Sequence, residues 1–313
     1  MSFHEKVYGQ NFINQVSKYI SPESYKREKT PIIVFLCGKK IKENADEKTN
    51  REYVIKYFEK DGNNLITLLS EHLWQDEFLS EIDLLTFEEF IVEICDYILI
   101  FVESYGSACE LGAFTYHNKQ YQKKLVVYMH SKFKNDKSFI NQGPIEKIRK
   151  IGQRVIYTDW DKGLLGDEEV LKSLIDVSSF QDRSTKRYHK EIRENGNENV
   201  KIYLTTFLYE ICELINLLQP ISSKELISFY KRLKNIESFT FIKSDKNEFS
   251  SPIQVKHILK LLSVIGYISI SSDLIKLNKR IIDSTFLFNY GTRTYSRIRS
   301  CYLAKKYKYE KIL

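Results

Sequence analysis

The first half of the chain alternates short, continuous apolar runs with segments of helical periodicity. Apolar runs of strand length are typical of parallel strands that are buried on both faces. The segments between them carry apolar residues three and four apart, as helices with one buried face do. This pattern predicts a doubly wound (Rossmann-like) parallel α/β sheet. The predicted strands lie at 32–36, 65–69, 97–102, 125–129 and 155–157, and the predicted helices at 50–60, 86–94 and 108–116.

The second half of the chain has a mostly helical pattern. Ser251 and Gln254 fit a capping box around Pro252, and Gly266 is placed to end the helix that begins there. Two short runs separated by Ser271-Ser272-Asp273 then predict a hairpin. Successive helices followed by a hairpin predict a mostly α winged-helix domain. The predicted helices span 202–218, 223–233 and 252–265, and the predicted strands span 267–270 and 274–277.

These patterns divide the chain into four predicted segments. Residues 1–30 are polar and rich in Lys and Tyr, and we interpret them as an N-terminal extension. Residues 31–176 form the predicted α/β domain, and 177–200 form a charge-dense connector that can be helical. Residues 201–313 form the predicted winged-helix domain with a basic tail.

The net charge of +7 is distributed unevenly along the chain. Residues 1–182 hold 24 Lys and Arg against 29 Asp and Glu, whereas residues 183–313 hold 24 against 12. An acidic half is thus followed by a strongly basic one. Such a split indicates that the C-terminal part faces nucleic acid.

The cysteines and the apolar runs limit the class of protein. Cys37, Cys95, Cys109, Cys212 and Cys301 are far apart, with no C-x-x-C pair and no cluster of histidines. They are typical of core thiols in a reducing cytosol, so no disulfide framework and no metal site are expected. No apolar run approaches the roughly 20 residues that a membrane-spanning helix needs. We therefore expect a cytoplasmic protein with no membrane partner.

The segment FVESYGSACELGAF at Phe101–Phe114 is the main candidate for chemistry. It begins where a predicted strand ends, and small ligands bind at such strand ends in open α/β sheets. Gly106 allows a close approach of the backbone, and Glu110 is placed in the first turn of the next helix, where the helix dipole favours an ionised carboxylate. The alternative is structural, because Ser107 and Glu110 also fit a capping box.

Residues at two other predicted strand ends are candidates to line the same site. Cys37 and Gly38 end the first strand, and Lys39 and Lys40 follow as possible phosphate contacts or as solvated lysines. Glu71 follows the second strand, where it either lines the site or caps a helix.

The spacing S-x-G-x-x-x-E-L-G, formed by Ser104, Gly106, Glu110, Leu111 and Gly112, resembles the signature of the nucleoside 2-deoxyribosyltransferase superfamily and its N-glycosidase relatives. The resemblance implies a domain of that type, in which Glu110 attacks C1′ of the sugar, and in which Ser104, Gly106 and Ser107 hold ribose or phosphate. The transferases mostly have Asp in place of Ser104. This departure favours hydrolysis over base exchange.

The chain is even more similar to the effector proteins of type II-A retrons, across nearly its whole length. The matching blocks are FLCGKK at Phe35–Lys40, ESYGSACELGAF, and the segment Ser131–Lys150, although Tyr105 and Lys39 replace a usual Pro and Gly. This resemblance implies an antiphage toxin that hydrolyses NAD⁺ as its substrate and uses no separate cofactor. It also implies a complex with a reverse transcriptase and its branched RNA–DNA (msDNA), which holds the toxin in check. Higher-order self-association is a further expectation.

Two alternatives to this reaction stay open. The nicotinamide of NAD⁺ leaves without protonation, whereas a neutral base needs a general acid. Glu88 matches an acidic residue that contacts the base in deoxyribosyltransferases, so it either takes that role, with a raised pKa, or is a solvated helix charge. With such an acid the chain would be a deoxynucleotide N-glycosidase or deoxyribosyltransferase. The other alternative is a non-catalytic nucleic-acid-binding regulator that senses a nucleotide.

Basic residues interleaved with tyrosines mark the predicted nucleic-acid contacts. Cationic groups neutralise phosphates, and tyrosine rings stack on unpaired bases. The predicted helix at 252–265 projects Lys256, His257 and Lys260, although winged helices also serve as partner modules. In the tail, the candidate tyrosines include Tyr290, Tyr295, Tyr302 and Tyr307, and the alternative is a solvated basic segment. The basic candidates of the tail are Arg293, Arg297, Arg299, Lys305, Lys306 and Lys308.

Overall fold

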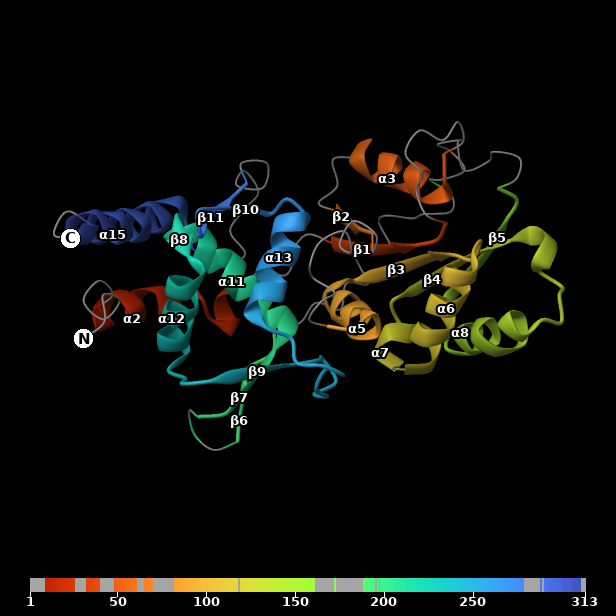
Figure 1. Cartoon of the computed structure of the whole chain (residues 1–313), viewed down its shortest axis with the longest axis horizontal. Coiled ribbons are helices and arrows are strands. Elements are labelled where there is room, and N and C mark those ends of the chain that lie inside the picture. Colours follow the sequence, from red (N-terminus) through yellow and green to blue (C-terminus); the bar gives the residue numbers. More distant parts are fainter. Residues whose placement is uncertain are drawn as a thin grey trace. The chain divides into compact units, whose positions relative to one another are not determined.

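The computed structural model of the chain divides into two compact units (Figure 1). The sheet unit comprises residues 31–185, and the helical unit comprises residues 1–30 together with 186–313. Each unit is described by itself. The structure describes residues 9–25, 32–39, 48–60, 65–69, 82–117, 119–160, 172, 188–194, 196, 198–278, 288 and 290–310.

Five parallel strands form one sheet in the described part of the sheet unit, in the order β2-β1-β3-β4-β5. This order is one of the common doubly wound arrangements, so the predicted Rossmann-like parallel sheet is confirmed. The apolar runs form strands because each strand of a parallel sheet is covered on both faces. The strands are β1 (Ile32–Cys37), β2 (Leu65–Leu68), β3 (Tyr97–Phe101), β4 (Leu125–His130) and β5 (Arg154–Thr158).

Helices cover both faces of this sheet. Helix α3 lies on one side, and α5 and α6 lie on the other (Figure 1). Alternate residues such as Val34, Leu36 and Leu99 pack with α3 in one hydrophobic core, so the intervening residues of β1, including Cys37, face α5 and α6. Strands β1, β3 and β4 are buried throughout. The helices are α3 (Asn50–Lys60), α5 (Leu84–Ile94), α6 (Tyr105–His117), α7 (Lys119–Gln122), η4 (Ser131–Phe133), η5 (Asn141–Ile145) and α8 (Glu146–Lys150).

The strand order reverses between β1 and β3. The chain proceeds from β1 outward to β2 and then returns to place β3 on the other side of β1. In open α/β sheets, ligands bind beyond the carboxyl ends of the strands at such a switch point. The sequence candidates Cys37, Gly38 and Ser104 all lie at these two strand ends.

The N-terminal residues are part of the helical unit, although the sequence pattern predicted a separate extension. Helix α2 (Gln10–Tyr19) packs on α12 (Ser223–Lys234), with the Phe12 and Phe229 rings 6.0 Å apart. A short turn, η1 (Pro22–Ser24), precedes Tyr25, which pairs with Phe288 in a β-bridge. Contacts with residues that are distant in sequence therefore hold this segment in the helical unit.

The centre of the helical unit follows the order helix, strand, helix, strand, helix and hairpin, and the strand between the last two helices belongs to a second sheet. Strand β8 joins the hairpin in a sheet of order β10-β11-β8, and Ser272 and Asp273 adopt positive φ angles of 49° and 62°, as tight hairpin turns require. The capping box of Ser222 and Glu225 at the start of α12 is present. The elements are α11 (Leu204–Leu218), β8 (Ile221–Ser222), α12, α13 (Val255–Val264), β10 (Ile268–Ser271), β11 (Leu274–Leu277) and the C-terminal α15 (Thr292–Glu310).

Two predicted helix starts in this unit are wrong. Helix α13 begins at Val255 and is capped by Gln254 with His257, so the predicted box at Ser251 does not form. Helix α11 begins at Leu204, because the residues before it pair in a second sheet of order β6-β7-β9. Strand β6 and the start of β7 belong to the predicted connector, residues 177–200, so the described end of that connector is extended and not helical. Its strands are β6 (Ile192–Arg193), β7 (Val200–Tyr203) and β9 (Phe239–Ile242).

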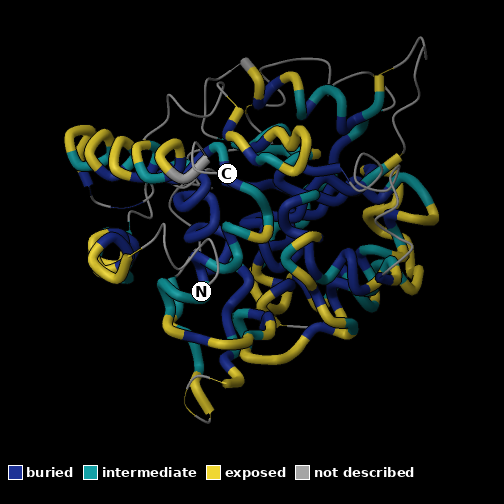
Figure 2. Tube along the Cα trace, turned by 60° about the vertical axis from the view of Figure 1, so that its left-hand side comes forward, coloured by how far each residue is buried: buried dark blue, intermediate teal, exposed yellow. Residues whose placement is uncertain are grey.

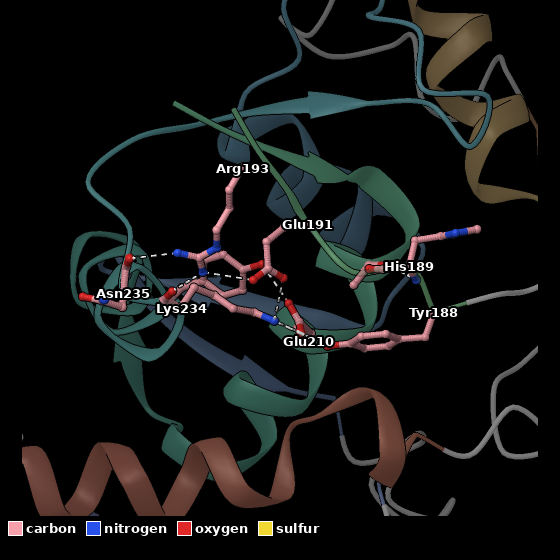
Figure 3. Close-up of polar contacts among 9 residues, drawn as sticks. Tyr188, His189, Glu191, Arg193, Glu210, Lys234 and Asn235 are labelled. Atoms are coloured by element: carbon pink, nitrogen blue, oxygen red, sulfur yellow. Dashed lines mark hydrogen bonds and ion pairs between the residues drawn. The ribbon is translucent and has the colours of Figure 1, made fainter. Parts of the chain in front are cut away.

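A buried carboxylate fastens the segment 188–193 to the rest of the helical unit (Figure 3). Glu210 of α11 is fully buried and accepts hydrogen bonds from the Tyr188 hydroxyl, from the Tyr230 hydroxyl at 2.7 Å and from the Lys234 ammonium. Arg193 donates to the Lys234 carbonyl at 2.7 Å. Burial raises the pKa of Tyr188 and Tyr230, and the Glu210 charge raises it further, so both hydroxyls stay protonated donors. We call Glu210 and these partners the Glu210 network.

None of the helices that the structure describes is long and apolar enough to cross a membrane.

Candidate functional site

Two serines determine where α6 begins. The Ser104 hydroxyl accepts from the Ser107 N–H at 3.1 Å, and the Ser107 hydroxyl accepts from the Ser104 N–H at 3.1 Å. The helix therefore starts at Tyr105, three residues before the predicted start. The predicted capping box of Ser107 with Glu110 is wrong, because Ser104 and Ser107 cap the helix reciprocally.

The earlier start moves Glu110 into the second turn of α6. The helix dipole acts mainly within the first turn, so the sequence argument for its effect on Glu110 is weakened. Glu110 is half-buried, and its surroundings are set by the residues of β1 and α5 that it meets.

Cys37, Glu88 and Glu110 meet on the face of the sheet that α5 and α6 cover. Burial raises the pKa of the Cys37 thiol well above its ordinary range, and the nearby carboxylates of Glu110 and Glu88 raise it further. The Cys37 thiol also lies within hydrogen-bonding reach of Glu110. Burial, assisted by the Glu110 charge, raises the pKa of Glu88 to about 7. A protonated thiol, the Glu88 carboxyl group with its raised pKa and the Glu110 carboxyl group thus share one site.

Glu103, at the carboxyl end of β3, was missed in the sequence. Its Oε1 accepts from the Lys39 N–H at 2.8 Å, and its Oε2 accepts from the Asn50 side chain at 2.7 Å. Burial raises the pKa of Glu103 above the ordinary glutamate value despite the hydrogen bonds from Lys39 and Asn50, which lower it. The available signal was its place: a carboxylate directly after a buried strand, at the edge where ligands bind.

Gly38 is required by the close packing around Glu103. A Cβ at this position would lie 2.9 Å from Glu103 Oε1 and 3.2 Å from the Phe101 Cβ. Lys39 follows with an exposed side chain, while its backbone is held by neighbouring side chains. Lys40 and Glu71, the other candidates at these strand ends, lie outside the described residues.

The remaining predicted contacts of the motif differ in exposure. Ser107 is buried and its hydroxyl is engaged in the helix cap, so we assign it to the scaffold of the site. Ser104 is half-buried and shares that cap, whereas Gly106 is exposed. Tyr105, which replaces the usual Pro, is 95% exposed and so leaves its ring available at the start of α6.

A histidine at the end of β4 was also missed. His130 is buried, its Nδ1 accepts from the Lys132 N–H at 3.1 Å, and its Nε2 lies 3.5 Å from Asp159 Oδ1. The Trp160 ring packs against it with centroids 5.5 Å apart. The sequence signal was its position at the end of the strand next to β3. Among the described residues, no cluster of His, Cys, Asp and Glu could hold a metal ion.

The raised pKa of Glu88 predicts a pH-dependent stability. The folded chain keeps a proton on Glu88 that the unfolded chain releases between pH 4.5 and about 7, so stability falls as the pH rises through this window. This shift in the pKa of Glu88 lowers the free energy of unfolding by roughly 3 kcal/mol once Glu88 is fully ionised. Glu88→Gln should therefore melt above the wild type at pH 8 and close to it at pH 4.5.

Differential scanning calorimetry at both pH values tests this expectation. Glu89→Gln, at the neighbouring position of α5, is the matched control. Equal differences between Glu88→Gln and wild type at both pH values would contradict the assignment.

The predicted nucleic-acid residues of the helical unit fall into two groups. Lys256, Arg293, Arg297 and Lys308 are exposed, and Lys260 is half-buried. The second group contacts the protein itself. Arg299 donates to the Asn216 carbonyl at 3.3 Å, Lys305 lies over the Phe12 ring, and the buried Lys306 donates to the Pro220 carbonyl at 2.8 Å.

Several predicted stacking or projecting side chains are also inside the fold. Tyr290 and Tyr302 are buried, with their hydroxyls bonded to Glu213 and to the Pro220 carbonyl. His257 is buried in the cap of α13, so the prediction that it projects is wrong. Tyr307 is 56% exposed and remains a candidate for stacking.

Comparison with known proteins agrees with the retron-effector resemblance. The family model of the STM3845 retron effector protein matches residues 47–270. The retron Ec73 protein of Escherichia coli, which is named a putative ribosyltransferase/DNA-binding protein, is 32% identical over 219 residues, 66% of this chain and 67% of that protein. The retron Ec86 protein of Escherichia coli, with the same description, is 31% identical over 156 residues, 49% of this chain and 48% of that protein. The chain belongs to the STM3845 retron effector family.

Proposed function

We propose that the sheet unit is an N-glycosidase that hydrolyses NAD⁺, with Glu110 as the nucleophile. The observation that carries the proposal is the meeting of Glu110 with Glu88 and Cys37 beside the strand ends of the switch point. A pair of carboxyl groups of unequal pKa is the usual equipment for cleaving a glycosidic bond. The site motif also favours a domain of the nucleoside deoxyribosyltransferase type.

Of the three acidic side chains, Glu110 suits the nucleophile best. Both Glu103 oxygens accept hydrogen bonds from the protein, which turns this carboxylate toward Lys39 and Asn50 and lowers its nucleophilicity. Glu88 is buried and protonated over much of the neutral range, since its pKa is about 7. Glu110 is more accessible than Glu88 and belongs to the motif shared with N-glycosidases.

The reaction has two steps. The Glu110 carboxylate bonds to C1′ of the ribose as the C1′–N bond of nicotinamide breaks, and the nitrogen takes the bonding electron pair. The nicotinamide nitrogen is cationic in NAD⁺, so it leaves neutral without a proton. Water then attacks C1′ as the bond between C1′ and the Glu110 oxygen breaks, which releases ADP-ribose, the Glu110 carboxylate and one proton to solvent. The ribosyltransferase names of the two relatives support glycosyl transfer of this class.

A second substrate class is favoured by one observation. Glu88 has a pKa of about 7 and lies near Glu110, as a general acid for a neutral base would. The full-length protein should be incubated with NAD⁺ and with deoxynucleotides side by side, and the products separated by chromatography. Free nicotinamide supports the first proposal, and free bases support the second. Nucleotide binding without either product would favour a regulator that only senses nucleotides.

We propose that the helical unit is a winged-helix module that binds the branched nucleic acid of a retron. The succession of α11, β8, α12 and α13, with β9 of the other sheet between the last two helices, and then the β10–β11 hairpin supports the winged-helix assignment. The names of both relatives include DNA binding. In this proposal the reverse transcriptase and its msDNA bind the chain and hold the toxin in check.

The exposed cations of α15 should govern the salt dependence of this binding. Arg293, Arg297 and Lys308 recur along one exposed face of the helix, and α15 shows exposed turns along its length (Figure 2). Replacing all three by Ala removes three phosphate partners, so the slope of log affinity against log salt should become shallower by about 2 for single-stranded DNA.

Fluorescence anisotropy with branched single-stranded DNA at several salt concentrations measures this slope. A matched triple variant replaces three exposed lysines of the sheet unit: Lys123, Lys137 and Lys150. The same slope in both triple variants would contradict the α15 assignment.

A further inference from the structure

Glu103 joins three elements around the end of β1. The carboxylate follows β3, and it binds the backbone N–H of Lys39 and the side chain of Asn50, the first residue of α3. The Glu103 N–H is within 3.2 Å of the Ser107 hydroxyl, which belongs to the cap of α6. One residue thus connects the loop after β1 with the loop that leads to Glu110.

Arg51 completes the hold on the same loop. Its side chain is 2% exposed, and its Nε and Nη2 donate to the Lys39 carbonyl at 3.0 and 2.6 Å. Both backbone groups of Lys39 are therefore bound by side chains from other elements. Gly38 packs against Glu103 with no room for a Cβ. We call Glu103, Asn50 and Arg51, with the Lys39 backbone, the Glu103 clamp.

We propose that Glu103 is a positioning residue for nucleotide binding. Its carboxylate holds the Gly38–Lys39 backbone against the end of β3, and so fixes the surface on which the ribose and phosphates rest beside Glu110. This inference rests on the proposed N-glycosidase function. Glu103 does not touch the reacting atoms, because both of its oxygens are occupied by the clamp.

The polarity of the Asn50–Glu103 hydrogen bond allows a specific test. In Glu103→Gln, the carboxylate charge is lost, and the new side-chain amide meets the Asn50 NH2 unless the Asn50 amide turns over, so the charge-assisted hydrogen bond is lost in either case. In Asn50→Asp, two carboxylates face each other. The double variant Glu103→Gln/Asn50→Asp restores the bond with donor and acceptor exchanged, while the carbonyl oxygen of the new amide still accepts from the Lys39 N–H.

Amide hydrogen exchange of Lys39 in the full-length protein reads the clamp directly. Either single variant should speed this exchange and raise KM for NAD⁺ by about tenfold, the effect of one charged hydrogen bond, with a smaller change in kcat. The affinity for ADP-ribose, measured by calorimetry, should fall in parallel. The double variant should recover both the protection of Lys39 and the affinity.

Glu52→Gln is the matched control, because Glu52 binds the Thr49 N–H at 2.6 Å at the start of the same helix and does not reach the clamp. It should leave KM and the Lys39 exchange unchanged. The proposal is overturned if the single variants leave Lys39 protected, or if exchange rises while ADP-ribose affinity and KM stay constant. If the wild type cleaves no nucleotide, the proposed function fails, while Lys39 exchange and ADP-ribose affinity still decide the role of Glu103.

Discussion

Replacing Glu110 by Gln should lower the rate of NAD⁺ cleavage by about a thousandfold or more, because an amide is not a nucleophile for C1′. The substitution preserves size and removes the charge beside Glu88 and Cys37. Binding of ADP-ribose should stay within a few-fold of wild type, since the proposed role of Glu110 belongs to the transition state and not to the ground state. The expected loss is therefore in kcat.

Release of nicotinamide, followed by chromatography, measures this loss. Glu146→Gln changes a surface glutamate of α8 that pairs with Lys150, and it should retain full activity. An NAD⁺ analogue with fluorine at C2′ slows the second step, so mass spectrometry should find the sugar bound to the peptide that contains Glu110. Substantial activity in Glu110→Gln, or a sugar bound to another residue, would exclude Glu110 as the nucleophile.

Replacing Glu210 by Ala should destabilise the helical unit by about 3–5 kcal/mol, because the change leaves a mostly buried cation without its main partner. Lys234 is the cation, and the Tyr188 hydroxyl loses its acceptor as well (Figure 3). The Tyr230 hydroxyl also loses its acceptor. The segment 188–193 should then detach first, since the Glu210 network fastens it to α11.

The two tryptophans provide a selective measurement. Trp160 packs in the sheet unit, and Trp74 falls within the same range of residues, 31–185, so no tryptophan fluorescence comes from the helical unit during urea denaturation. Far-UV circular dichroism reports on both units, and in Glu210→Ala it should show an earlier transition than fluorescence does. The exposed Glu237→Ala in the same unit should shift neither signal by more than about 0.5 kcal/mol. An unchanged circular dichroism transition in Glu210→Ala would contradict the role of the network.

The parallel sheet could be predicted from the sequence because its strands carry their own signal. A strand covered on both faces is a continuous apolar run, and β1, β3 and β4 are buried throughout. The switch point between β1 and β3 depends on the order of the strands in the sheet, and that order could not be predicted from the sequence. Gly38 directly after one predicted strand, and the loop before Glu110 directly after another, nevertheless allowed the candidate site to be predicted at the carboxyl edge of the sheet.

The details of the site depend on contacts between distant segments. Ser104 caps α6 in place of Ser107, and both serines satisfy the local capping rule, so sequence spacing alone does not separate them. Glu103 acquires its role from Lys39 and Asn50, which are 64 and 53 positions away. Such partners follow only from the folded sheet.

In the helical unit, the sequence overestimated the exposed positive surface. Lys306 and Tyr302 have the composition of a nucleic-acid-binding tail, yet both bind the Pro220 carbonyl inside the unit. The periodicity of a single helix shows which residues share a face, but a basic helix with no strong apolar stripe does not reveal which face is covered. The burial along α15 resolves this question.

The assignment of residues 1–30 to the helical unit has a consequence for synthesis on the ribosome. The sheet unit ends at residue 185. Phe12 packs on α12 and Tyr25 pairs with Phe288, and both partners are translated later. Domains fold largely in the order of their emergence, so the nascent chain completes its Rossmann-like part while α2 still lacks its partners. A partner that binds only the finished helical unit, as proposed for the msDNA complex, can therefore act only after translation has passed the sheet unit.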